Sequence, residues 1–164
     1  MFNEGVIGII PNARIKTGMF STKMYTLVFT NQRLILAEAT KDLVNAQIEQ
    51  ARAAAKAQGG GFFAQWGAQL KSGFRFGQHY LGMPPGAILA ETPGNGALAP
   101  ADVRELKIER KTRNAASDDG FEQDFLKITI EATTGKHVFE TDGEQPKRDE
   151  ARGMAASVFG PAVR

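Results

Sequence analysis

The sequence of 164 residues contains no cysteine and only two histidines, which removes several kinds of site from consideration. Without cysteine the chain forms no disulfide bond and offers no thiolate to a metal ion or to a catalytic centre. His79 and His137 stand far apart and lack the HxxxH or HxE spacing that is typical of metal sites. We therefore expect no metal site and no cofactor, and we interpret the two histidines as a loop residue and a strand residue.

Motifs that carry catalysis or phosphate binding are also missing. No GxSxG sequence is present, and Gly59-Gly60-Gly61 lacks the GK[ST] ending with which a P-loop holds phosphate and magnesium. Asp118-Asp119-Gly120 is not followed by the bidentate glutamate that an EF-hand requires. The glycine run is typical of a helix end and the acidic segment of a turn, so the sequence predicts a protein that is not an enzyme.

Charge and long apolar runs are limited too. Twenty basic and eighteen acidic residues give a net charge of +2, which is too small to predict a nucleic-acid partner. No apolar run approaches the roughly 20 residues of a membrane-spanning helix. The first ten residues, MFNEGVIGII, have no basic segment before their apolar run and do not resemble a signal peptide. We expect one soluble cytoplasmic domain, with association at a membrane surface as the alternative.

The clearest pattern that is present is a β-hairpin over Tyr25 to Ala37, YTLVFTNQRLILA. Two runs of alternating apolar residues meet at the polar break from Thr30 to Arg33, where Asn31 tolerates the left-handed backbone of a tight turn. The fork of donors on Arg33 predicts a structural role, in which its guanidinium ties the hairpin to a nearby carboxylate or carbonyl group; a ligand-binding role is the alternative. A first strand is predicted before the hairpin, over Val6 to Lys16.

Further strands and one helix are predicted in the second half of the chain. Alternation favours strands over Val103 to Lys111, Phe121 to Thr133 and Lys136 to Thr141. From Lys147 to Phe159, apolar residues then recur at helical spacing until Gly160-Pro161 ends the pattern. The chain therefore combines a mainly antiparallel set of strands with a closing amphipathic helix.

The Thr-Asn-x-Arg hairpin and the closing helix resemble the pleckstrin-homology-like (PH-like) superfamily, in particular its GRAM and bacterial PH-like domains. The resemblance implies a β-barrel of about seven antiparallel strands capped by the C-terminal helix, with a helical insertion after strand 3. In this view residues 1–164 form one PH-like domain, with the barrel over 4–39 and 100–160 and the insertion over 40–99. We expect Val158 and Phe159 to be buried against Leu27, Phe29, Leu126 or Ile128.

The insertion is predicted to begin with a helix over Lys41 to Gln58, capped by Thr40. A second helix is expected over Phe62 to Tyr80 and a short strand over Ala87 to Glu91. The second helix gathers a dense group of aromatic residues, with Leu70, into a candidate interaction surface: Phe62, Phe63, Trp66, Leu70, Phe74, Phe76 and Tyr80. These side chains cover the barrel, pack on a partner chain, or lie in a membrane interface. Replacing Gln58 to Pro85 by a short linker is expected to leave the barrel folded.

Three basic residues, Arg14, Lys16 and Lys23, flank the loop between the first two strands. In lipid-binding PH domains, basic residues at this loop clamp a phosphorylated headgroup, so the resemblance implies a lipid or anion site here; a solvated basic edge is the alternative. The sequence thus predicts a non-enzymatic binding or scaffold module that acts through the insertion on a protein partner or a homo-oligomer. Its alternative is anionic-lipid binding through the first loop and the basic, aromatic insertion.

Overall fold

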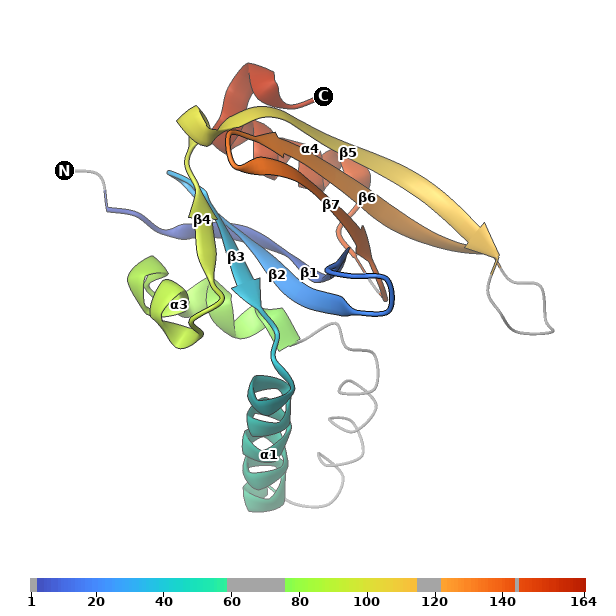
Figure 1. The fold of residues 1–164 in the computed structure, drawn as a ribbon. Helices are drawn as coiled ribbons and strands as arrows, with labels where there is room; N and C mark the ends of the chain where they lie inside the picture. Colours follow the sequence, from blue (N-terminus) through green and yellow to red (C-terminus); the bar gives the residue numbers. More distant parts are fainter. Residues whose placement is uncertain (1–2, 59–75, 115–121, 144) are drawn as a thin grey trace.

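The computed structural model describes residues 3–58, 76–114, 122–143 and 145–164, which form a mainly β fold (Figure 1). Seven strands build one antiparallel sheet: β1 (Val6–Lys16), β2 (Thr22–Thr30), β3 (Leu34–Glu38), β4 (Gly96–Leu98), β5 (Val103–Asn114), β6 (Glu122–Ala132) and β7 (Gly135–Thr141). The helices are α1 (Lys41–Gln58), α3 (Pro85–Glu91) and α4 (Arg148–Phe159), with 3-10 turns η1 (Phe76–Gly82), η2 (Pro100–Asp102) and η3 (Gly160–Ala162). The predicted antiparallel sheet and C-terminal helix are confirmed.

The strands follow the order β4-β3-β2-β1-β7-β6-β5. The pairing of β1 with β7 therefore joins the strands β1 to β4 to the strands β5 to β7. The junction is narrow, because β1 and β7 pair only at Ala13 with Thr141 and at Arg14 with Glu140. No pairing in the described part of the chain joins the outer strands β4 and β5. The sheet is therefore not closed, and the expected closed barrel is wrong for this structure.

The turn between β2 and β3 is built by side chains rather than by a left-handed residue. The Thr30 hydroxyl accepts hydrogen bonds from the backbone N–H groups of Gln32 and Arg33, at 3.1 and 3.0 Å. Asn31 does not have the positive φ that the sequence suggested, and its side chain instead bonds to the backbone of Gly5. The polar side chains of this turn thus also hold the start of the chain beside it.

Arg33 has the structural role that was predicted from its position. Its guanidinium donates two hydrogen bonds to the Glu4 carboxylate, at 2.7 and 3.0 Å, and both side chains are partly buried. Burial alone raises the pKa of Glu4, but the hydrogen bonds from Arg33 and Thr30 outweigh it and hold that pKa below its ordinary value. The pair therefore stabilises the fold while Glu4 is ionised.

We expect Arg33→Lys to lower the free energy of unfolding by about 1–2 kcal/mol at neutral pH, because lysine cannot form the two-bond fork. Since the folded-state pKa of Glu4 is lowered, the stabilisation is complete above the unfolded pKa and is lost as the pH falls through the folded one. Urea denaturation of both proteins should show their difference shrinking in acid. Equal stabilities at neutral pH would contradict a structural role for Arg33.

One face of the sheet forms the main core beneath α4. Phe159, at the end of α4, is 6% exposed and belongs to the same buried cluster as Leu27, Phe29, Leu126 and Ile128. Val158 is partly buried against this cluster. Lys147 is the N-cap of α4, and its N–H donates a hydrogen bond to the Glu150 carboxylate. The predicted packing of the helix end is thus confirmed for Phe159.

The opposite face of β2 and β3 is covered by the insertion. Tyr80 from η1 and Ile88 from α3 are fully buried with Val28, Ile35 and Ala37. The segment expected to be a strand over Ala87 to Glu91 is helical, with Pro85 in the first turn where a missing N–H costs nothing. Part of the segment whose removal was expected to leave the fold intact, Gln58 to Pro85, thus packs on the sheet. Whether the shortened chain folds stays a prediction, which the stability of a linker variant will test.

The contact of η1 with the sheet is unusually close at Gly77. A Cβ atom at this position would lie 2.8 Å from the Thr26 Cγ2 atom and 3.1 Å from the Ile9 Cδ1 atom. A residue with a Cβ atom would therefore have to displace these side chains, whereas glycine lets the η1 backbone lie directly against them. Gly77 thus allows η1 to pack closely on β1 and β2.

Helix α1 has the predicted bounds and the predicted N-cap, since the Thr40 hydroxyl accepts a hydrogen bond from the Leu43 N–H at 3.2 Å. It extends away from the sheet (Figure 1). The second predicted helix lies mostly outside the described residues, which resume with η1 at Phe76.

The two outer strands of the open sheet, β4 and β5, differ in how much unpaired backbone they expose. Strand β4 has only three residues. On β5, the Leu106 carbonyl accepts a hydrogen bond from the Arg164 N–H at 2.9 Å, and the Ile108 carbonyl accepts one from the Arg148 side chain at 3.0 Å. The C-terminal residues thus occupy part of the β5 edge.

Candidate functional site

A groove opens beside the narrow junction of β1 and β7. The two strands part after Arg14 and Glu140, because β1 continues with β2 as its partner while β7 remains paired with β6. The space between them measures about 510 Å³. Side chains of four strands line it: Arg14, Ile15, Lys16, Thr22, Lys127, Lys136, Val138 and Glu140. We call this space the basic groove.

The lining carries four basic side chains and one acidic one, a net charge of +3. Arg14 is in contact with Asp142, and the Lys136 ammonium group lies 4.0 Å from the Glu131 carboxylate. Lys16 and Lys127 form no ion pair with any described residue. A concave site with unneutralised ammonium groups attracts anions, because its cations reinforce one another while the protein walls exclude water.

The groove contains two of the three basic residues predicted to bind an anion. Arg14 and Lys16 line it together, whereas the Lys23 ammonium group lies 3.7 Å from the Glu38 carboxylate and is not part of the lining. Lys127 and Lys136 were missed. Strand alternation places both on the outward face, but the sequence does not show that β7 lies next to β1.

The loop between β1 and β2 projects beside the groove. Its base is closed by a backbone hydrogen bond from Thr17 to Ser21 at 3.0 Å and by a contact of their hydroxyl groups at 3.0 Å. At its tip, Met19 is 90% exposed and Phe20 is 98% exposed. Two large apolar side chains are thus held in solvent, directly between the groove residues Lys16 and Thr22. We call residues 17–21 the apolar loop.

The predicted aromatic surface is only partly visible. Phe62, Phe63, Trp66, Leu70 and Phe74 lie outside the described residues, and nothing is described of the Phe76 side chain. Tyr80 is fully buried, so it belongs to the core and not to an interaction surface. Self-association through this segment stays a prediction, which light scattering after gel filtration will test.

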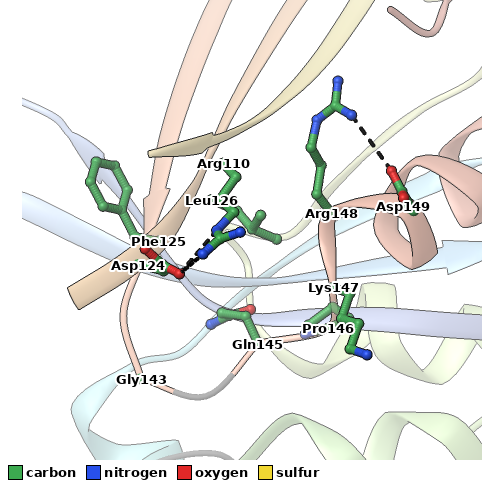
Figure 2. Close-up of a pocket in the computed structure, with 10 residues that line it drawn as sticks. All are labelled: Arg110, Asp124, Phe125, Leu126, Gly143, Gln145, Pro146, Lys147, Arg148 and Asp149. Atoms are coloured by element: carbon green, nitrogen blue, oxygen red, sulfur yellow. Dashed lines mark hydrogen bonds and ion pairs between the residues drawn. The ribbon is translucent and has the colours of Figure 1, made fainter. Parts of the chain in front are cut away.

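A second cavity, of about 650 Å³, lies between β5, β6 and the start of α4 (Figure 2). Its cations are largely engaged. Figure 2 shows Arg110 directed at Asp124 and Arg148 directed at Asp149. The Arg148 side chain also donates to the Ile108 carbonyl. Hydrogen bonds from Arg110 and Thr112 lower the pKa of Asp124, so this carboxylate stays ionised beside its partner. Two of the three cations that line this cavity are thus paired with carboxylates, and only Lys147 has no ion pair with a described residue.

The two histidines lie apart in the structure as well. The His79 Nε2 atom is 3.7 Å from the Glu91 carboxylate, next to Tyr80, while His137 stacks on Phe139. In the described ranges, no group of three or more histidine, aspartate or glutamate side chains is arranged to hold a metal ion.

Comparisons with known proteins do not identify the chain. No family model and no curated protein matches it. A crystal structure of the C-terminal domain of an unknown protein from Leishmania infantum is similar over 95% of this chain and 84% of that one, with 11% sequence identity and a TM-score of 0.43. This likeness is too distant to carry an argument. None of the described helices has the length and apolar character needed to cross a membrane.

Proposed function

We propose that this chain is a non-enzymatic binding module that docks on anionic membrane surfaces with the apolar loop and the basic groove. The observation that carries the proposal is the near-complete exposure of Met19 and Phe20 at the tip of a loop whose base is held by hydrogen bonds. Exposing two large apolar side chains to water is unfavourable, and a lipid interface removes that cost.

The surrounding charge supports the same orientation. Lys16 ends β1 immediately before the apolar loop, and Arg14, Lys127 and Lys136 lie beside it in the groove. When the loop enters the interface, these cations face the headgroup layer, where each basic residue contributes about 1 kcal/mol at an anionic surface. Apolar insertion and electrostatic attraction therefore act on one face of the molecule.

We further propose that the fold is PH-like. The hairpin from Tyr25 to Ala37, the order of seven antiparallel strands and the C-terminal helix packed on the sheet support this assignment. In lipid-binding PH domains the loop between the first two strands faces the membrane, and here that position is taken by the apolar loop.

Vesicle flotation tests the proposal. We expect the protein to float with phosphatidylcholine vesicles that contain an anionic lipid, and to float poorly with phosphatidylcholine alone. Met19→Ser with Phe20→Ser should lower binding at least about tenfold, since burying one large apolar side chain contributes about 1.5–3 kcal/mol. Lys16→Ala and Lys127→Ala should each lower it about fivefold, and high salt should weaken binding further.

Two matched variants control for general surface effects. Leu81→Ser removes another exposed apolar side chain, which is 51% exposed but lies on η1, and Lys23→Ala removes a lysine that the groove does not use. Both should bind vesicles as the unchanged protein does, and all variants should melt at similar temperatures. If the apolar loop variant floats as well as the unchanged protein, the proposed membrane face is wrong.

A further inference from the structure

Glu140 is the single acid among the described residues that line the basic groove. It stands in the middle of the groove wall, because its Cα atom pairs with that of Arg14 on β1 and with that of Lys127 on β6. A row across three strands thus reads basic, acidic, basic. Opposite charges in such directly facing positions usually pair.

Glu140 forms no ion pair with any described residue, although cations flank it on both sides. Arg14 forms its ion pair with Asp142, which also lies 3.8 Å from Arg113, and Lys136 forms its ion pair with Glu131. Glu140 is exposed at the groove surface. Its two oxygens therefore remain able to accept hydrogen bonds from a ligand that enters the groove.

A ligand that satisfies this lining needs groups of both signs. Lys16 and Lys127 can bind phosphate or carboxylate oxygens, and Glu140 can accept hydrogen bonds from a positively charged donor. An ammonium group is such a donor and has three N–H groups. A lipid headgroup with a phosphate alone leaves the Glu140 carboxylate next to another anion. A neutral headgroup that carries one phosphate and one ammonium group supplies only one anionic group for the two unpaired lysines, Lys16 and Lys127.

On the premise that the groove binds membrane headgroups as proposed above, we propose that it selects an anionic aminophospholipid and that Glu140 receives its ammonium group. Phosphatidylserine has the required set, with a phosphate, a carboxylate and an ammonium group in one headgroup. Lys16 and Lys127 bind the two anionic groups, and Glu140 serves as the residue that determines specificity. Its charge lowers the affinity for every headgroup that lacks an amino group.

The expected selectivity is modest, because a solvent-accessible ion pair contributes little. At about 0.2–1 kcal/mol per exposed pair, one ammonium contact corresponds to about a threefold preference. Phosphatidylserine and phosphatidylglycerol carry the same net charge, so a comparison of the two separates recognition of the amino group from attraction to a charged surface.

Flotation with vesicles of equal charge tests this inference. The unchanged protein should bind phosphatidylserine vesicles about threefold better than phosphatidylglycerol vesicles. Glu140→Gln should remove this preference, chiefly through stronger binding to phosphatidylglycerol, since the variant no longer repels a headgroup without an amino group. Glu105→Gln changes the net charge equally but lies on β5 outside the groove, and it should keep the preference.

The outcomes separate the two proposals. Equal binding of the unchanged protein to both anionic vesicles would overturn the selectivity and leave the membrane function standing. A preference that persists in Glu140→Gln would also overturn the inference, because another residue would then recognise the amino group. Failure to float with either anionic vesicle would reject the membrane function itself, and the inference with it.

Discussion

Replacing Tyr80 by alanine is expected to lower the free energy of unfolding by about 3–5 kcal/mol, the usual effect of removing a large aromatic side chain from a core. Tyr80 is fully buried and packs with Val28, Ile35 and Ile88. Its hydroxyl donates a hydrogen bond to the Glu91 carboxylate at 2.5 Å, which ties η1 to the end of α3. Burial, together with this carboxylate, raises the pKa of Tyr80 far above its ordinary value.

Tyr80→Phe provides the matched control, because it keeps the ring and removes only the hydroxyl. It should cost about 1–3 kcal/mol, since Glu91 then loses its donor in a largely buried place. Urea denaturation gives both values, with an unchanged slope if the folded states are alike. A cost below about 1 kcal/mol for Tyr80→Ala would mean that the sheet is stable without the insertion packed on it.

Phe159→Ala is expected to cost a similar amount, about 3–5 kcal/mol, on the other face of the sheet. The ring lies in the main core at the last turn of α4, before Gly160 ends the helix with a φ of 55°. Removing it takes away the contact that holds the helix end on the strands. Thermal or urea unfolding measures the loss.

Val158→Ala serves as the neighbouring control for this change. Val158 is only partly buried against the core, so its truncation should cost about 1 kcal/mol. If the two variants are equally stable, the helix end does not depend on Phe159, and the main core is supported by the strands alone.

The parts of the fold that were predicted correctly depend on local patterns. The bounds of β1 and α1 follow from alternation and helical spacing within a single segment, and the Arg33 fork needed only a nearby carboxylate, which Glu4 supplies. The end of α4 was predicted because its apolar residues recur at helical spacing up to Gly160. The helix and strand bounds were thus decided within short segments, whereas the partner of Arg33, which the sequence did not name, lies 29 residues away.

The errors arise where distant contacts decide. The run Ala87 to Glu91 is too short for its apolar residues to distinguish a strand from a helix, and the preceding Pro84-Pro85 pair was the missed signal for a helix start. The aromatic spacing around Tyr80 is compatible with a surface or with a core. Only the contact of Tyr80 with β2 and β3 shows that it belongs to the core. The basic groove joins four strands, so spacing along the chain could not reveal it.

The open ends of the sheet bear on how copies of this protein meet one another. An unclosed sheet presents backbone donors and acceptors at its two outer strands, and such edges recruit strands from other molecules into growing aggregates. Here β4 is too short to template a long partner, while the bonds from Arg164 and Arg148 occupy carbonyl groups along β5. Arg164 and Arg148 therefore oppose edge-to-edge polymerisation through β5. An open sheet is exposed to this polymerisation, whereas a closed barrel has no free edge.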